Sequence, residues 1–368
     1  MDSGKARKLF ESYAAAMAYV EVENQGGDLN IGSAFHVGEG VFVTARHVVE
    51  GNKIVEVGMT ESIDIELAGS EAEDARSFVY SDGKKQPVHR VSNGVMKLEG
   101  GPYFHGDDRV DVAVFKVEEI DSHTPVVPLG GHLDDWLGRS DFVLTEAVVL
   151  GYPPIPMAKY PTLVGTRAEV SAQIDLYGTP HVHFVLSAMA RGGFSGGVAF
   201  SEYGFALGMV TMSLLSGEQS VESGYMSAVT VEPIFECLGL HKLLPDCQAE
   251  GWDGLWGTTH LYFYDGSSYQ EYPNGVTGGR VAAGVDILDD GKQFSLTIFC
   301  DDNADLLSGA MNSIMRELDE YTLDHSEIRP GMIRVEIRGA NASAGERIKI
   351  AGHSVARVFA EYGYIPSR

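Results

Sequence analysis

Between residues 18 and 235, short apolar runs alternate with turn-forming residues. Runs such as "GVFVTA", "VDVAVFKV", "EAVVLGY" and "HVHFVLSA" are rich in Val, Phe and Tyr, and Gly, Asp, Asn and Pro stand between such runs. Many short strands at this spacing are typical of β-sandwiches and β-barrels. We therefore predict an all-β domain over residues 18–245, in which the run 125–136 bridges two halves.

The segments on either side of this region have a different pattern. Residues 1–17 contain no Pro and no Gly after Gly4. This pattern predicts a short N-terminal helix. After residue 250, strand-like runs alternate with two helix-like segments, which predicts a smaller α+β domain over residues 250–368. The first of these helices, 303–321, places on one side the apolar residues Leu306, Leu307, Met311, Ile314, Met315 and Leu318.

Charge and composition exclude several classes of protein. The chain has 27 Lys and Arg against 52 Asp and Glu, a net charge of −25, and no basic run. This field opposes phosphate, so we expect no nucleic-acid partner. We expect no membrane span either, because no apolar run approaches about 18 residues.

Cysteine usage and the N-terminus bear on the compartment. Cys237, Cys247 and Cys300 are scattered and form no CxxC pair, which favours reduced thiols over a disulfide framework or a zinc site. The first 24 residues lack the long apolar core of a signal peptide. We therefore expect a cytoplasmic protein that uses no cofactor and no metal.

The stretch "RGGFSGG" surrounds Ser195 with glycines, although glycine inside a regular element costs about 0.5–1 kcal/mol relative to alanine. Alone, it would be interpreted as a glycine-rich hairpin loop. Two other residues suggest chemistry: His47 follows an apolar run in "GVFVTARHVVEG", and Asp111 precedes one in "DDRVDVAVFKV". Acyl transfer needs a serine nucleophile, an imidazole base and a carboxylate that orients the base. The glycines would then let the N–H groups of Gly193 and Ser195 point at an oxyanion.

The ordered motifs T-A-x-H, D-x-A-V and G-x-S-G-G resemble those of chymotrypsin-like (trypsin-fold) serine peptidases, of the bacterial type that includes the HtrA-like enzymes. The resemblance covers roughly residues 18–236. It implies an all-β double six-stranded β-barrel with the site in the cleft between the barrels. It also implies a serine endopeptidase that cleaves protein or peptide substrates through an acyl-enzyme on Ser195, with His47 as base and acid and Asp111 orienting it.

The resemblance further implies a substrate pocket near the nucleophile. The pocket residues it suggests are Met189, Arg191, Val210 and Thr211. No acidic residue occurs among the six residues before Ser195, so cleavage after Lys or Arg is not supported. We expect an apolar or small pocket, with Arg191 able to contact an acidic side chain.

The same residues allow two alternatives to an active peptidase. Residues 193–197 also satisfy G-x-S-x-G, the nucleophile elbow of α/β-hydrolases, but glycines follow where a helix should start and His47 precedes the serine. A latent or non-cleaving binding module on a protease fold remains open, used or activated by a partner through residues 250–368. That segment is also a candidate for self-association.

The pair His181 and His183 lies on one face of a predicted strand. Two histidines at this spacing can be metal ligands, but the sequence indicates no third ligand nearby. We therefore interpret them as part of a polar face of the second barrel.

Overall fold

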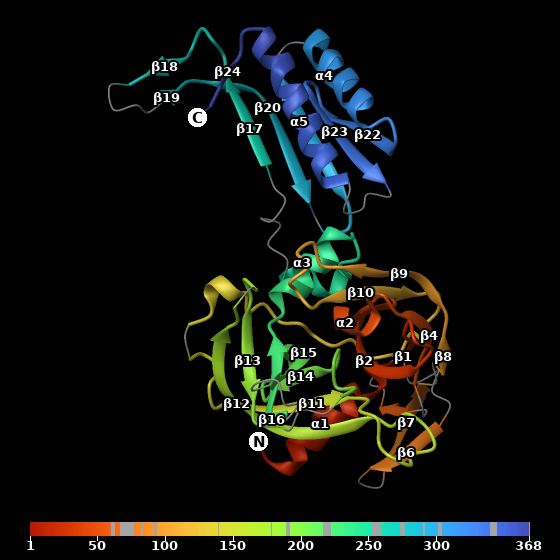
Figure 1. Ribbon diagram of the computed structural model, residues 1–368. Coiled ribbons are helices and arrows are strands. Elements are labelled where there is room, and N and C mark those ends of the chain that lie inside the picture. The colour runs from red at the N-terminus through yellow and green to blue at the C-terminus, as the bar shows by residue number, and fades with distance from the viewer. Residues whose placement is uncertain are drawn as a thin grey trace. The chain divides into compact units, whose positions relative to one another are not determined.

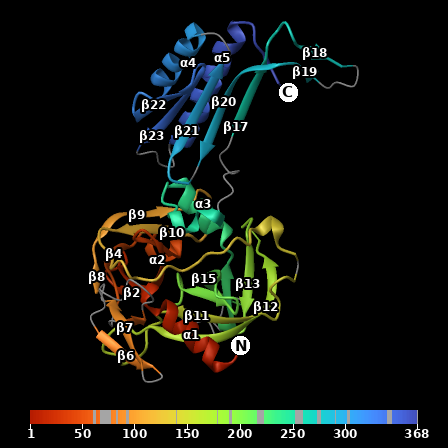
Figure 2. The same ribbon diagram turned by 180° about the vertical axis from the view of Figure 1, so that it is seen from behind.

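The computed structural model describes residues 1–59, 63–66, 77–81, 84–91, 94–138, 140–177, 179–188, 192–215, 222–251, 259–272, 277–289, 291–300, 304–338 and 344–367 (Figures 1 and 2). The chain divides into two compact units. The N-terminal unit comprises Met1–Cys237 and Pro245–Gly251, and the C-terminal unit comprises Leu238–Leu244 and Trp252–Arg368.

A seven-stranded antiparallel sheet forms the first half of the N-terminal unit. Its strands, in spatial order, are β8 (Val95–Met96), β4 (Lys53–Gly58), β1 (Met17–Glu23), β2 (Leu29–Gly38), β3 (Val41–Thr44), β10 (Ala113–Val117) and β9 (Leu98–Phe104). Buried Phe35, Phe42 and Phe115 lie on the adjacent strands β2, β3 and β10. The short strands and their turns therefore fold as the punctuation predicts.

This sheet differs from the expected six-stranded barrel. Its two end strands, β8 and β9, are separated in the chain by the single residue Lys97. One strand that bends at Lys97 therefore contributes its first part to one end of the sheet and its second part to the other. A three-stranded sheet, β5 (Ile63–Glu66), β7 (Lys84–Val91) and β6 (Ser77–Ser81), branches from the same half of the unit.

The second half of the unit is a closed six-stranded β-barrel. Its strands, in spatial order, are β11 (Glu146–Gly151), β12 (Val164–Asp175), β13 (Val182–Leu186), β16 (Glu222–Val229), β15 (Ala206–Leu215) and β14 (Val198–Ser201). Alternate residues point inward, because successive side chains of a strand face opposite sides. The pairs Ala147 with Val149 and Phe184 with Leu186 show this period of two and belong to one buried core.

Short helices accompany these strands. They are α1 (Ser3–Tyr13), which Asp2 caps by accepting from Lys5 N–H, a 3₁₀ turn at Ala14–Ala16, α2 (Arg46–Val49), a 3₁₀ turn at Asp134–Trp136, α3 (Glu232–Leu240) and a 3₁₀ turn at Asp246–Gly251. One of them, α3, begins in the N-terminal unit and ends in residues of the C-terminal unit. The N-terminal helix packs on the second barrel, where the Tyr13 ring stacks on Phe200 at 4.4 Å between centroids.

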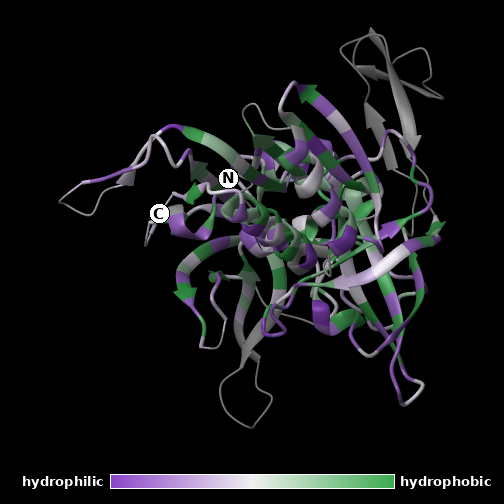
Figure 3. Cartoon of the chain, turned by 90° about the horizontal axis from the view of Figure 1, so that it is seen from above, coloured by the Kyte–Doolittle hydropathy of each residue, from purple (hydrophilic) through white to green (hydrophobic). Residues whose placement is uncertain are grey.

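The C-terminal unit is a six-stranded antiparallel sheet with two helices. Its elements are β17 (Thr259–Tyr264), β18 (Gln270–Glu271), β19 (Thr277–Gly278), β20 (Val281–Asp289), β21 (Phe294–Cys300), α4 (Ala304–Glu317), β22 (Thr322–Arg329), β23 (Met332–Arg338), α5 (Ala344–Glu361) and β24 (Ile365–Pro366), with β18 and β19 forming a separate ribbon. Apolar residues of α4 and α5 share one core with the sheet. Along helices and strands, hydrophobic and hydrophilic residues alternate in bands (Figure 3). Met315, expected in the apolar stripe of the first helix, is 49% exposed.

Two further observations concern the described residues. None of the helices in this part of the chain is both long and apolar enough to cross a bilayer. No disulfide joins any two of Cys237, Cys247 and Cys300.

Candidate active site

His47 and Asp111 meet because their strands pair. His47 lies on α2, immediately after β3, and Asp111 lies two residues before β10, which is antiparallel to β3. Asp111 Oδ2 lies 2.8 Å from His47 Nδ1, and Asp111 Oδ1 accepts from the His47 backbone N–H at 2.9 Å. The carboxylate thus fixes the imidazole with its proton on Nδ1, which leaves Nε2 free to act as a base.

Ser195 lies in a tight turn between β13 and β14. The Gly197 N–H donates to Phe194 O at 2.7 Å, and Gly196 has φ +83°. A positive φ at the third of four residues defines a type II turn, which explains a glycine at this position. Ser195 is the second of the four turn residues and is partly exposed.

The Ser195 turn packs against the chain that leads into His47. A Cβ atom on Gly196 would lie 2.0 Å from Ser33 O, 2.6 Å from Thr44 Oγ1 and 3.0 Å from Ala45 N. Ser33 N–H also donates to Ser195 O at 2.8 Å. Any side chain at residue 196 would push the Ser195 turn away from the segment that leads into His47. The structure therefore brings the three sequence-predicted residues to one side of the N-terminal unit.

The Ser195 hydroxyl is directed toward β15. Its Oγ donates to Thr211 O at 3.2 Å. Within the described residues, no hydrogen bond joins the Ser195 and His47 side chains. The hydrogen bonds therefore pair Ser195 Oγ with β15, and the His47 ring with Asp111.

Gly193, which the sequence analysis names as an oxyanion donor, lies in a backbone conformation that needs glycine. Gly193 has φ +87°, a conformation that favours glycine, and a Cβ there would lie 2.7 Å from Tyr152 O. Among the described groups, none accepts a hydrogen bond from the N–H of Gly193 or Ser195. Both donors are thus available to a ligand oxygen.

Ser33 is a residue of the site that sequence reasoning missed. It is fully buried on β2; its Oγ donates to Gly193 O at 2.6 Å and accepts from Tyr152 N–H at 2.8 Å. These two bonds fix the carbonyl of Gly193. They join the first sheet to two segments of the second barrel, the Gly193 loop and the residue that follows β11. No local sequence signal marks this serine, because its role depends on two distant segments.

We expect Ser33→Ala to lower kcat by about 10²-fold, because the Gly193 loop loses its anchor and small misplacements of reacting groups are costly. The free energy of unfolding should fall by about 1–3 kcal/mol, since the buried N–H of Tyr152 loses its acceptor. Ser201→Ala is the matched control: Ser201 is fully buried and bonds Phe205 O at 3.1 Å in the second barrel. Steady-state kinetics and urea unfolding measure both effects. Equal loss of kcat in the two variants would contradict a role for Ser33 in the site.

The hydrogen bond to Asp111 raises the pKa of His47 above its ordinary value of 6.5, because the carboxylate favours the charged imidazolium. A base must be neutral to accept a proton, so kcat/KM should fall on the acid side with a midpoint above 6.5. In Asp111→Asn the midpoint should move to lower pH. The pH dependence of kcat/KM and an NMR titration of the His47 ring measure this shift. A wild-type midpoint at or below 6.5 would refute the coupling.

The predicted pocket residues are only partly within the structure. Met189 and Arg191 lie outside the described residues. Val210 is buried in the core of the second barrel, so its side chain does not line an open pocket. Thr211 lies where the pairing of β15 with β16 shifts its register. Its carbonyl oxygen accepts a hydrogen bond from the Ser195 hydroxyl.

His181 and His183 are 5% and 4% exposed and therefore do not form a solvent-facing polar surface. His181 instead lies beside His105 and Glu236, and these three residues could hold a metal ion. The sequence could not indicate this cluster, because its members come from three separate segments.

The closed barrel beside a second antiparallel sheet is consistent with the double-barrel architecture of chymotrypsin-like proteins, a class in which serine, histidine and aspartate can act together. Residues 32–209, which include His47, Asp111 and Ser195, match the trypsin-like peptidase domain family. The chain therefore contains a trypsin-like serine peptidase domain.

Two solved structures show the degree of similarity between this chain and known proteins. The active form of the Rv3671c protease of M. tuberculosis has 17% identity and a TM-score of 0.41, covering 64% of this chain and 86% of its own. The HtrA-type protease AlgW with a tripeptide has 15% identity and a TM-score of 0.41, covering 81% of this chain and 93% of its own. No curated protein sequence matches this chain.

Proposed function

We propose that the chain is a serine endopeptidase whose catalytic residues are Ser195, His47 and Asp111, in a cleft between two chymotrypsin-like barrels. The observation that carries the proposal is the bidentate contact of Asp111 with the backbone and ring of His47, next to the glycine turn of Ser195. The family match of the surrounding segment supports it.

In this mechanism, His47 Nε2 takes the Ser195 proton as Oγ attacks the carbonyl carbon of the scissile peptide. The tetrahedral oxyanion accepts hydrogen bonds from the N–H groups of Gly193 and Ser195, each worth about 3–4 kcal/mol in the transition state. His47 then protonates the leaving amine, and water releases the acyl group by the reverse sequence. Asp111 stabilises the imidazolium and keeps its own charge throughout.

We infer that the substrates are proteins or peptides, and that the residue before the cleaved bond is apolar or small. The sequence supports this class because no acidic side chain precedes Ser195 within six residues. Arg191 remains a candidate contact for an acidic substrate side chain.

The test is covalent labelling with a fluorophosphonate probe, followed by mass spectrometry of the labelled peptide. We expect one adduct per chain on Ser195, no adduct in Ser195→Ala, and an adduct in the control Ser187→Ala, which removes an exposed serine of the same barrel. Equal labelling of wild type and Ser195→Ala would reject the proposed nucleophile.

A second candidate function is a protease-fold binding module that cleaves only after a partner turns Ser195 toward His47. The observation in its favour is the bond from Ser195 Oγ to Thr211 O. Under this alternative, isolated wild type binds peptides and leaves them intact, with a fluorophosphonate adduct appearing only when the partner is added. Turnover by the isolated chain would exclude it.

A further inference from the structure

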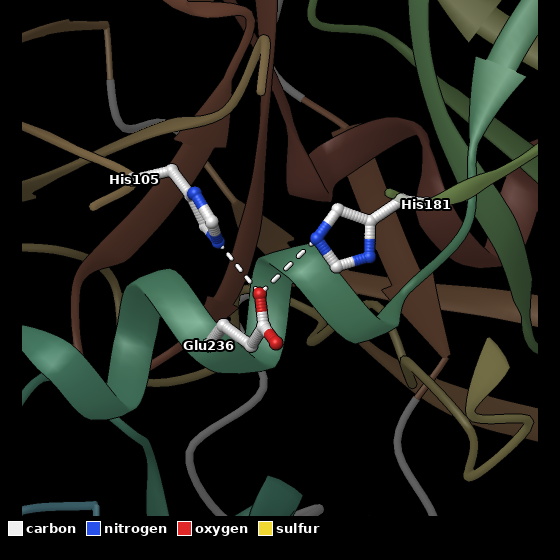
Figure 4. Close-up of side chains that lie close together, drawn as sticks. All are labelled: His105, His181 and Glu236. Carbon is white, nitrogen blue, oxygen red and sulfur yellow. Dashed lines mark hydrogen bonds and ion pairs between the residues drawn. The ribbon is translucent and has the colours of Figure 1, made fainter. Parts of the chain in front are cut away.

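Two histidines and a glutamate converge on one point of the N-terminal unit, away from Ser195 in the chain. His105 follows β9, His181 precedes β13, and Glu236 lies on α3. Both imidazole rings point at the same carboxylate oxygen (Figure 4). His105 Nε2 lies 2.7 Å and His181 Nε2 lies 3.2 Å from Glu236 Oε2, and all three atoms lie within 4.8 Å of one another.

The cluster is enclosed but not sealed. The side chains of His105 and His181 are 9% and 6% exposed, whereas that of Glu236 is 29% exposed. A small solute thus has a route to the carboxylate side, and bulk water is kept from the rings. A buried pair of imidazoles with one carboxylate is a donor set that Zn²⁺ prefers.

Outer groups orient the ring of His181. Asp134 Oδ2 lies 2.9 Å from His181 Nδ1, and Asp134 Oδ1 accepts from Thr230 Oγ1 at 2.5 Å. A carboxylate on Nδ1 holds a proton there and directs the other ring nitrogen at the cluster. Metal-binding histidines commonly have such a carboxylate partner.

His105 needs one rearrangement. Its Nδ1 lies 3.0 Å from Asp107 N, which donates to it, and 3.4 Å from Asp107 O. For Nε2 to bind a cation, the ring proton must move to Nδ1, where Asp107 O is the nearby acceptor. The backbone of one residue therefore faces Nδ1 with both a donor and an acceptor.

The spacing suits a tetrahedral ion. Bonds of about 2.0–2.1 Å at tetrahedral angles separate ligand atoms by about 3.3 Å. The two observed separations from Glu236 Oε2, 2.7 and 3.2 Å, require only small outward shifts. Charge also favours a cation: Asp134 and Glu236 add two carboxylates here, in a chain of net charge −25.

We propose that His105, His181 and Glu236 bind one divalent transition-metal ion, of which Zn²⁺ is the best fit, with solvent at the fourth position. On binding, the Nε2 proton of His181 leaves to solvent and that of His105 moves to Nδ1. The ion joins the end of β9 and the start of β13 to the middle of α3. Because His105 N–H bonds Val112 O at 3.1 Å, the ion also fixes the segment that carries Asp111.

The test uses the full chain in a Ser195→Ala background, so that its outcome is independent of peptidase activity. Chelator-treated protein is dialysed against Zn²⁺, and bound metal is measured by mass spectrometry. We expect one ion per chain, lost in Glu236→Gln and in His181→Gln. Two controls should keep the ion: His325→Gln, an exposed histidine of the other unit, and His47→Gln, which removes a different His–carboxylate pair.

A direct readout avoids dependence on variants that fold poorly. Co²⁺ added to the apo-protein should give the strong visible bands of a four-coordinate nitrogen and oxygen site, and Zn²⁺ should displace them. Asp134→Asn should weaken binding by about 10–100-fold, because it removes the carboxylate behind His181. Absence of bound Zn²⁺ and of these bands in the parent chain, or full retention in folded Glu236→Gln, would overturn the proposal in favour of a network held by protons alone.

Discussion

In Ser195→Ala, turnover of peptide substrates should fall by on the order of a million-fold, because the acyl-enzyme can no longer form. His47→Ala should cost nearly as much, since the serine hydroxyl is a weak nucleophile without its base. The double variant should be no slower than either single variant, because the two residues act as one unit. Residual hydrolysis above the uncatalysed rate would come from substrate binding and the Gly193 and Ser195 amides.

Single-turnover kinetics with a fluorogenic peptide measure these losses. Ser187→Ala, an exposed serine of the same barrel whose Oγ accepts from Glu169 N–H at 2.8 Å, should retain full turnover. Losses that multiply in the double variant would mean that the two side chains act independently. That outcome would remove the basis for His47 as the base of Ser195.

The fold of the N-terminal unit was predictable to the level of β-barrels because strand punctuation is local information. The strands of the closed barrel, β11 to β16, show alternation such as that of Ala147 and Val149. This alternation can be recognised within a short stretch of sequence. The bend at Lys97, which divides one strand between both ends of the first sheet, follows from long-range closure and leaves no local mark. The prediction that Met315 lies on the apolar side of its helix is wrong, because the buried face of α4 is narrower than the apolar stripe in the sequence.

The family was predictable from three short motifs, and the trypsin-like peptidase match confirms it. The roles of His47, Asp111 and Ser195 stay predictions. The sequence could not predict two sets of contacts between segments. Ser33 donates a hydrogen bond to the Gly193 loop, and His105 lies beside His181 and Glu236. Each of these contacts joins segments that are distant in the chain, and none of the side chains involved has a distinct local sequence signature.

The dependence on a close backbone approach can be tested at Gly196. Gly196→Ala should lower the free energy of unfolding of the N-terminal unit through two effects. A left-handed alanine costs about 1–2 kcal/mol. Its Cβ would also lie 2.0 Å from Ser33 O, and relieving that overlap costs about 1–3 kcal/mol or more. Fluorophosphonate labelling should fall by about 10²-fold, because the Ser195 turn must shift away from Thr44 and Ala45.

Gly204→Ala separates the two effects. Gly204 has φ +96°, similar to the +83° of Gly196, but a Cβ there meets nothing within 4 Å. This control should therefore show the conformational cost alone and keep its labelling rate. Urea unfolding and labelling kinetics compare the two variants. If both lose the same stability and both label normally, the serine turn does not need its close contact with the chain leading into His47, and the proposed alignment of nucleophile and base loses its structural support.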